Sequence, residues 1–315
     1  MDHAVSPAQF LRDGAHNGPR IAMAKGHDII DCFACGFRHV LPLPDPASLE
    51  QEYREKYYAD EKPTFIAHAG EDQAWFELAQ NDRLAIFERL LGPSRRRLLD
   101  IGCGPGFFLK TAIARGWDAH GIEPSRQAAA HARALCEKMG GACVTEGFFN
   151  ARAAPALGRF DVVNLTNVLE HVPDAAQTLK RATDLLVPGG VLCAGVPNDF
   201  SLFQVAARGA AEIGEWWLAP PHHLNYFDFD SLEGAVTRLG LKLAERTTSF
   251  PMEAFLMMGD NYVGDAALGR ACHGRRKNFD LAFEKAGLTH LRRDFYKALA
   301  KLGIGREAVV IATKP

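Results

Sequence analysis

From residue 97 to the end of the chain, short apolar runs alternate with stretches whose hydrophobic residues recur every three or four positions. The short runs predict strands and the longer stretches predict amphipathic helices. We expect strands over residues 97–101, 117–122, 142–145, 160–165 and 191–196, a further strand beginning at residue 241, and a last one over 308–312. This alternation predicts the α/β class, with a seven-stranded, mostly parallel sheet covered by helices on both faces.

The pattern is different before this region. Residues 1–71 are expected to be irregular, because Pro42, Pro44 and Pro46 interrupt any regular element. A charged, tyrosine-rich stretch over 48–58 predicts a short helix, and helical periodicity runs from Asp72 to Leu91. We therefore expect an irregular N-terminal segment over 1–71, a core over 72–249, a helical insertion over 250–305 and a last core strand within 306–315.

Two segments are longer than the connections of a minimal sheet. One covers residues 198–226, within the core, and the other is the insertion over residues 250–305. Long insertions at the ends of a sheet often carry function. Both segments are therefore expected to form a helical cap over a substrate.

Composition and charge narrow the class of protein. The chain has 315 residues, 47% of them hydrophobic, and a formal net charge of -2. The near-neutral charge gives no indication of nucleic-acid or membrane binding, and no apolar run reaches the length of a membrane span. Seven scattered cysteines are typical of reduced thiols. We expect a soluble, cytoplasmic protein without nucleic-acid or membrane partners; an oligomer is compatible with the sequence.

The most informative motif follows the first strand of the core. The strand ends at Asp100, glycines occupy positions 102, 104 and 106, and a helix with apolar residues begins directly afterwards. Alternate glycines allow a sharp turn and a close approach to a ligand, and the helix N-terminus favours an anionic group. A dinucleotide loop would instead have its third glycine at the position of Phe107.

A second acidic residue ends the next strand. Glu123 lies 21 residues after Gly102 and could accept hydrogen bonds from both ribose hydroxyls of an adenosine. The run Leu99-Asp-Ile-Gly-Cys-Gly-x-Gly106, followed by Gly121-Ile-Glu-Pro-Ser125, closely resembles the class I S-adenosylmethionine-dependent methyltransferases. The resemblance implies a Rossmann-like core and S-adenosylmethionine as cofactor. It is strongest with small-molecule enzymes such as quinone-biosynthesis and sugar methyltransferases, and the acceptor could be methylated on oxygen, nitrogen or carbon.

The resemblance also implies which residues hold the cofactor. Asp100 and the loop glycines would hold the methionine part, Glu123 the ribose, Phe148 the adenine, and Thr166 with Asn167 the region near the amino group. Cys103 resembles a nucleophile, but a small residue packed beneath the cofactor is the favoured interpretation. The implied cofactor-binding residues are Asp100, Gly102, Cys103, Gly104, Gly106, Glu123, Pro124, Phe148, Thr166 and Asn167.

Methyl transfer also requires a group that removes a proton from the acceptor, and histidine suits this task near neutral pH. The candidates are His171, in the turn after the fourth strand, and the pair His222-His223. Trp216, Trp217 and Tyr226 flank this pair and are expected to form a substrate wall. Alternatively, His171 shapes its turn, and the pair caps a helix and packs against the tryptophans.

Two patterns suggest metal binding, but neither is complete. Some methyltransferases carry Glu-x-x-Glu-His after the fourth strand, whereas this chain has Asn167-x-x-Glu170-His171 and so lacks the first carboxylate. Cys32-x-x-Cys35 resembles a zinc knuckle, yet a second cysteine pair is absent. His16, His27 and His39 are the nearby substitutes, at a spacing that is not a recognised zinc pattern. No metal is expected at either place.

Three alternatives to a small-molecule methyltransferase remain. An RNA or protein methyltransferase would dock its substrate through the basic runs at 275–277 and 292–293. A nicotinamide-dependent oxidoreductase would share the architecture. A non-catalytic protein would bind S-adenosylmethionine without methylating an acceptor.

Overall fold

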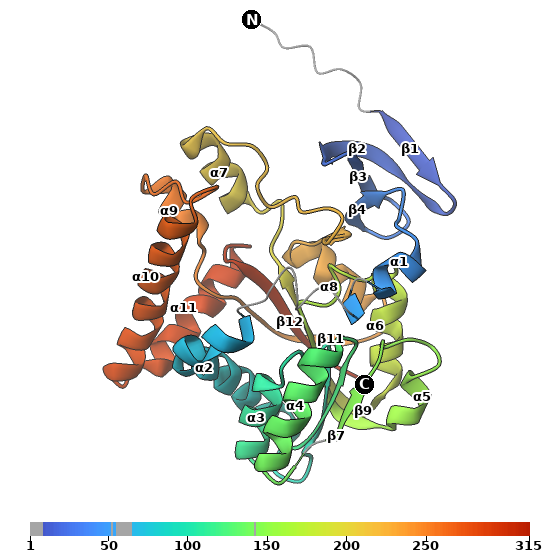
Figure 1. Ribbon diagram of the computed structural model, residues 1–315, viewed down its shortest axis with the longest axis vertical. Coiled ribbons are helices and arrows are strands. Elements are labelled where there is room, and N and C mark those ends of the chain that lie inside the picture. The colour runs from blue at the N-terminus through green and yellow to red at the C-terminus, as the bar shows by residue number, and fades with distance from the viewer. Residues whose placement is uncertain (1–8, 52, 55–64, 142) are drawn as a thin grey trace, which may run out of the picture.

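A seven-stranded sheet forms the centre of the protein. The computed structural model describes residues 9–51, 53–54, 65–141 and 143–315 (Figure 1). Within these the strand order is β11-β12-β9-β8-β5-β6-β7. The strands are β5 (Arg97–Ile101), β6 (Asp118–Glu123), β7 (Cys143–Glu146), β8 (Phe160–Thr166), β9 (Leu186–Pro197), β11 (Lys242–Thr247) and β12 (Glu307–Thr313). Strands β5 to β9 are parallel, and β12 runs antiparallel to both β9 and β11. The predicted α/β class and mostly parallel sheet are confirmed.

Helices cover both faces of this sheet. Successive residues of a strand point to opposite faces, so neighbouring residues enter two different cores. Leu98 belongs to a core shared with α2 (Phe65–Leu91), α3 (Phe107–Ala114) and α4 (Arg126–Lys138). Its neighbour Leu99 belongs to the core beneath α6 (Ala175–Asp184) and α8 (Phe229–Thr237). The two-sided burial accounts for the continuous apolar runs in the strand sequences. A short helix, α5 (Ala154–Leu157), precedes β8.

The N-terminal segment is not irregular, which corrects the sequence-based expectation. It forms a second, antiparallel sheet in the order β1-β2-β3-β4-β10. The strands are β1 (Phe10–Asp13), β2 (His16–Ala24), β3 (His27–Cys32), β4 (Phe37–Leu41) and β10 (Asn225–Tyr226). Tight turns with glycines at positive φ, Gly14, Gly26 and Gly36, join the first four strands, and the prolines follow β4 rather than interrupting it.

Helix α1 (Pro46–Gln51) begins the stretch for which a helix was predicted over 48–58. Residues 52 and 55–58 of that stretch lie outside the described part of the chain. The long helix α2 begins at Phe65 rather than Asp72, within the segment expected to be irregular, and ends before Gly92 as predicted. The core domain therefore begins several residues earlier in the sequence than expected.

The insertion over 250–305 is helical, as predicted, and consists of α9 (Glu253–Met257), α10 (Ala266–Lys285) and α11 (Thr289–Lys301). Helices α10 and α11 lie beside α2 (Figure 1). Trp75 donates a hydrogen bond to Asp280 at 2.7 Å, and Asp82 accepts from Arg292 at 2.6 Å and from Arg293 at 2.5 Å. The insertion therefore supports α2 from outside the sheet.

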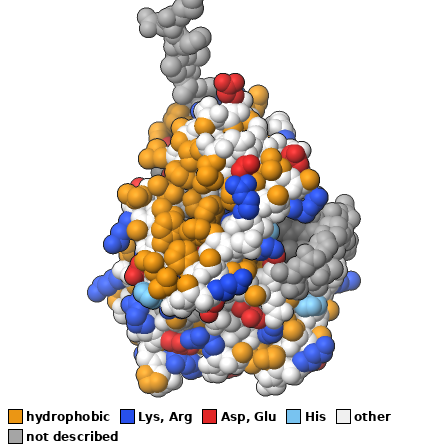
Figure 2. Space-filling model, turned by 90° about the vertical axis from the view of Figure 1, so that its left-hand side faces the viewer, with side chains coloured by type: hydrophobic (Ala, Val, Ile, Leu, Met, Phe, Trp, Pro, Cys, Tyr) orange, Lys and Arg blue, Asp and Glu red, His pale blue; other side chains and the backbone are white. Residues whose placement is uncertain are grey.

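The segment 198–226 contributes α7 (Leu202–Ala211), which packs against α9. Leu202, Val205 and Met258 are exposed on these two elements, and Figure 2 shows hydrophobic side chains gathered on the side of the molecule where the elements lie. Among the described residues, no helix combines the length and the apolar character needed to cross a bilayer.

Candidate functional site

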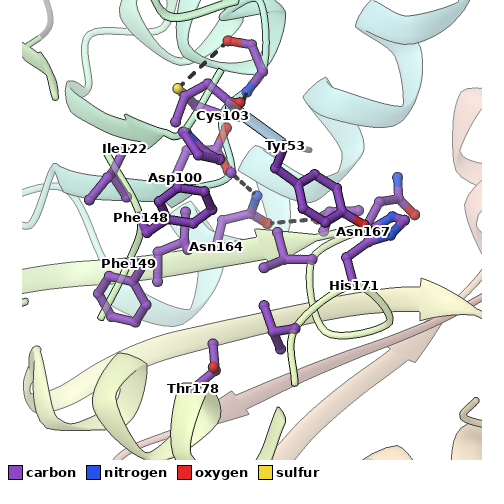
Figure 3. A pocket seen from close by; sticks show the side chains of 18 of the residues that line it. Tyr53, Asp100, Cys103, Ile122, Phe148, Phe149, Asn164, Asn167, His171 and Thr178 are labelled. Carbon is purple, nitrogen blue, oxygen red and sulfur yellow. Dashed lines mark hydrogen bonds between the residues drawn. The ribbon is translucent and has the colours of Figure 1, made fainter. Parts of the chain in front are cut away.

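A cavity of about 560 Å³ lies at the carboxyl ends of β5, β6 and β8, a volume within the range of small-molecule sites. In open α/β sheets ligands bind at this edge of the sheet. Figure 3 shows Phe148 and Phe149 on one side of the cavity and Tyr53 with His171 on the other. The cavity therefore lies between the glycine loop and the turn after β8.

The glycine loop has the conformation that its sequence predicts. Gly102, Gly104 and Gly106 have φ values of 69°, 51° and 86°, which side-chain-bearing residues rarely adopt. A Cβ on Gly102 would lie 2.6 Å from Val168 Cγ2, and one on Gly106 would lie 2.9 Å from Ala132 Cα. Both glycines are therefore required by close packing as well as by backbone conformation.

Glu123 ends β6 inside the cavity and is held by the backbone on both oxygens. Its Oε2 accepts from Gly104 N at 3.0 Å and its Oε1 accepts from Ser125 N at 2.9 Å. The side chain is buried, and this burial raises its pKa to about 7. Each oxygen keeps a lone pair for another donor, which suits the two hydroxyls of a ribose.

A chain of hydrogen bonds holds Asp100 at the end of β5. Asn164 Nδ2 donates to Asp100 at 2.6 Å, Thr166 Oγ1 donates to Asn164 Oδ1 at 3.3 Å, and Arg83 Nη1 donates to Thr166 Oγ1 at 2.9 Å (Figure 3 shows Asp100 and Asn164). Burial raises the pKa of Asp100 to about 7, although Asn164 and the charge of Arg83 oppose the shift. Arg83 and Asn164 belong to none of the motifs from which the site was predicted.

Nine of the ten predicted cofactor-binding residues line the cavity: Asp100, Gly102, Cys103, Gly104, Glu123, Pro124, Phe148, Thr166 and Asn167. Gly106 is the exception, and it packs against Ala132 directly before Phe107, which does line the cavity. Cys103 is buried against Gly121, and burial raises the pKa of its thiol well above the usual range. Its thiol is therefore protonated near neutral pH, which supports the packing role.

The structure separates the three candidate histidines. His171 lines the cavity, whereas His222 and His223 are not among its described lining residues. His171 Nδ1 lies 2.9 Å from the Tyr53 hydroxyl and 2.9 Å from the backbone oxygen of His222. Because a carbonyl oxygen only accepts, the second contact places a proton on Nδ1 and the imidazole lone pair on Nε2.

Glu170 and His223 lie behind His171, outside the described lining of the cavity. His171 Nε2 lies 3.7 Å from Glu170 Oε1, so an imidazolium would face a carboxylate. The ring of His223 packs edge-on against His171 at 5.0 Å. The ligand atoms of Glu170, His171 and His223 lie within 4.8 Å of one another and could also hold a cation.

Trp216, Trp217 and Tyr226, the expected substrate wall, are not among the described residues that line the cavity, so this prediction was wrong. Trp217 and Tyr226 are buried in a separate core with Ile29 and Val40 of the N-terminal sheet, and Trp216 packs against that core. The Tyr226 hydroxyl donates to the backbone oxygen of His223 at 3.1 Å. These side chains bury apolar surface against the N-terminal sheet.

The expectation that residues 198–226 and 250–305 cap the cavity is also corrected. The described lining includes no residue of 198–226 or 250–305. The cavity is instead covered by Leu49, Glu50 and Tyr53 from the N-terminal segment and by Phe76 and Gln80 of α2. The insertion instead packs against α2, through the Trp75–Asp280 and Arg292–Asp82 hydrogen bonds.

The strand order, the glycine loop and the paired carboxylates define the class I methyltransferase fold. The family model described as "Methyltransferase domain" matches residues 74–246, which is more than half of the chain. The chain therefore belongs to the methyltransferase-domain family and has the fold of its S-adenosylmethionine-dependent class I members.

Similar proteins were found among curated relatives and solved structures. The ubiquinone biosynthesis O-methyltransferase of Aromatoleum aromaticum is 35% identical over 133 residues, covering 42% of this chain and 57% of that protein. The enzyme of the same name from Rhodopseudomonas palustris (strain BisB5) is 31% identical over 157 residues, covering 48% and 60%. The chain thus spans about three fifths of the length of these relatives. A SAM-dependent methyltransferase structure from Archaeoglobus fulgidus has a TM-score of 0.47 and 16% identity, covering 79% of this chain and 99% of that one.

Proposed function

We propose that this protein transfers a methyl group from S-adenosylmethionine to a hydroxyl group of a small-molecule acceptor. The observation that carries the proposal is the pairing, in one cavity, of a backbone-held carboxylate at Glu123 with a histidine at His171. The relatives' names support an oxygen acceptor. The near-neutral net charge favours a small acceptor over a nucleic acid.

The residues around the glycine loop fit the cofactor. Glu123 would accept from the ribose hydroxyls, Phe148 would stack on the adenine, and Asp100 with Thr166 and Asn167 would face the methionine part. When bound, S-adenosylmethionine supplies an electrophilic methyl group next to a cationic sulfur. The buried carboxylates Asp100 and Glu123 favour such a cationic ligand.

His171 is the proposed general base. Its Nε2 would accept the hydroxyl proton of the acceptor while the new oxygen–carbon bond forms and the sulfur–carbon bond breaks. The carbonyl of His222 holds the opposite ring nitrogen, and Glu170 stabilises the resulting imidazolium. Positioning of the acceptor beside the methyl group supplies most of the remaining rate enhancement.

We also propose a cytoplasmic location. None of the six cysteines whose side chains the structure describes forms a disulfide. Free thiols persist in a reducing compartment.

Calorimetric titration with S-adenosylmethionine and S-adenosylhomocysteine tests the cofactor site. We expect micromolar binding that Glu123→Ala weakens at least tenfold, or about 1.4 kcal/mol. Glu146→Ala is the matched control, because Glu146 ends the neighbouring strand in register with Glu123 but is not among the described cavity residues. Absence of binding in a folded protein would contradict the proposal.

Transfer of labelled methyl groups to a panel of small hydroxyl acceptors tests the base. His171→Gln should lower kcat at least a hundredfold at unchanged cofactor affinity. His222→Gln should retain most of the activity, because the backbone carbonyl that contacts His171 remains. Equal activity in the two variants would show that His171 is not the base. Methylation of RNA or protein, with no small molecule methylated, would show that the acceptor is a macromolecule.

A further inference from the structure

A second group of chemically reactive side chains lies outside the cofactor cavity, in the N-terminal sheet. His16 begins β2, Cys32 ends β3, Cys35 lies in the following turn, and His39 lies within β4. One potential ligand atom from each of these four residues lies within 4.8 Å of the other three. None of the four is among the described residues that line the cavity.

The separations resemble those of a tetrahedral metal site. His16 Nδ1 lies 3.3 Å from Cys35 Sγ and 3.9 Å from Cys32 Sγ. Zinc bonds of about 2.3 Å to sulfur and about 2.0–2.1 Å to nitrogen, at tetrahedral angles, would place these atoms about 3.6 Å apart. The two observed distances lie on either side of that value, so small side-chain movements suffice.

The burial and hydrogen bonding of His39 are a second, independent indication of a metal ligand. It is only 1% exposed, and its Nδ1 donates to the backbone oxygen of Val40 at 2.9 Å. Its Nε2 is buried and has no hydrogen-bond partner within the described ranges 9–51, 53–54, 65–141 and 143–315. A buried acceptor without a partner is costly. A backbone carbonyl that orients one ring nitrogen while the other faces a metal is the usual arrangement around zinc.

The turn that carries the two cysteines is also fixed. Gly36 N donates to the backbone oxygen of Cys32 at 2.8 Å, and Gly36 adopts a φ of 70°. Arg238, at the end of α8, donates to the backbone oxygen of Cys35 at 2.6 Å. The turn therefore presents both sulfur atoms from a backbone held by the methyltransferase core.

We propose that His16, Cys32, Cys35 and His39 bind one zinc ion in a closed structural site. Two thiolates and two imidazoles are a ligand set that zinc prefers, and four protein ligands leave no open position for catalysis. The ion would link β2, β3 and β4. The incomplete cysteine pattern in the sequence is completed by histidines from two other strands.

The zinc site connects to the acceptor side of the cavity through β10. His39 pairs with Asn225, and Asn225 Nδ2 donates to the backbone oxygens of Leu169 at 2.8 Å and Val172 at 2.7 Å. These two oxygens flank the turn that carries His171. Loss of the ion should therefore disturb the His171 turn before it disturbs the glycine loop.

Metal analysis of the full chain, purified with reduced thiols and passed over a chelating column, tests the proposal. We expect one zinc per chain in the parent and in His27→Asn, which changes a histidine of the same sheet outside the group. Cys35→Ser and His39→Asn should each lose most of the metal. Equal zinc content in all four proteins would mean adventitious binding and would overturn the proposal.

Cobalt substitution of the parent protein avoids any dependence on variants that fold poorly. Co²⁺ in the site should give intense visible bands of tetrahedral coordination and a thiolate-to-cobalt charge-transfer band, both removed by one equivalent of zinc. A weak, octahedral-type spectrum would overturn the proposal. So would a Cys32–Cys35 disulfide, found by alkylation and mass spectrometry, in protein freshly isolated from zinc-replete cells.

Discussion

Gly106 and Gly116 flank helix α3 and have nearly the same φ values, 86° and 83°. They differ in their surroundings. A Cβ on Gly106 would collide with Ala132, whereas one on Gly116 would meet nothing within 4 Å. A side chain at Gly116 would therefore introduce backbone strain alone, whereas one at Gly106 would add a steric clash at the cofactor loop.

We expect Gly116→Ala to lower the free energy of unfolding by about 1–2 kcal/mol, the cost of a left-handed alanine. Gly106→Ala should cost more, because the backbone of α4 must also move, and it should weaken S-adenosylmethionine binding at least tenfold. Urea denaturation and calorimetric titration of both variants measure these effects. Equal losses of stability with unchanged binding would show that the loop tolerates a side chain.

Asp100 and Glu123 make the stability of the empty protein depend on pH. Burial raises the pKa of each to about 7, whereas carboxyl groups in an unfolded chain titrate near pH 4. Between about pH 4 and 7 the folded chain keeps protons that the unfolded chain has lost, so this contribution is complete below pH 4 and falls as the pH rises to 7. We expect Asp100→Asn to flatten that fall in urea denaturation, and Glu146→Gln to leave it unchanged.

Binding of S-adenosylmethionine should have the opposite pH dependence. A cationic ligand favours the ionised forms of both carboxyl groups, so its stabilising effect should grow as the pH rises from about 5 to 8. Thermal denaturation with and without the ligand measures the difference. A ligand-induced shift that is constant over this range would contradict the raised pKa values of Asp100 and Glu123.

The individual site residues differ in how far the sequence reveals them. Glu123 ends a strand and His171 lies in the turn after one, so their place at the edge of the sheet could be predicted from the alternation of strands and helices. Arg83 reaches Thr166 from a helix 83 positions earlier, and Tyr53 reaches His171 across 118 positions. No local spacing records such contacts, because they exist only after the elements have packed.

At the scale of elements, the pairing of β4 with β10 positions the turn that carries His171. Asn225 donates to two carbonyls of that turn and is 2% exposed. Asn198 is a matched control elsewhere in the fold: it is 1% exposed and donates to the backbone oxygens of Gly303 at 2.9 Å and Gly305 at 3.0 Å.

Asn225→Ala and Asn198→Ala should both reduce the free energy of unfolding, by about 1–3 kcal/mol for each buried carbonyl left without its partner. Only Asn225→Ala should lower kcat, about tenfold, while the Kd of S-adenosylmethionine stays within about threefold. Methyl-transfer kinetics and calorimetry separate the two effects. A comparable kcat loss in Asn198→Ala would show that general destabilisation explains both.

The strands of the N-terminal sheet were not predicted from the sequence, and β2 shows why. β2 contains Gly18 and Pro19 and has no clean alternation of buried and exposed positions. Such a strand has a weak sequence signal, because its pairing with β1 and β3, rather than a residue pattern of its own, places it in the sheet. The same reason explains Trp217 and Tyr226, whose partners Ile29 and Val40 lie far away in sequence.

At the scale of the whole molecule, the insertion over 250–305 stabilises the protein through α2. Arg292 is 3% exposed and bonds Asp82, whereas Arg275 and Asp260 form an ion pair with side chains 50% and 30% exposed. Asp82→Asn leaves a buried guanidinium without its charge partner and should cost about 3 kcal/mol. Asp260→Asn should cost less than about 1 kcal/mol. Urea denaturation of the two variants provides the comparison, and equal costs would mean that the insertion contributes little through Asp82.

The partnership of β4 with β10 has a consequence for the newly made chain. Ribosomes produce β4 long before Asn225 and Tyr226, so one edge of the first sheet emerges with its backbone N–H and C=O groups uncovered. Uncovered edges recruit strands of other chains, and nascent domains are exposed to such encounters during translation. Slow synthesis of the middle of this protein should therefore favour aggregation through β4, and chaperones that shield a strand edge should raise the yield of folded enzyme.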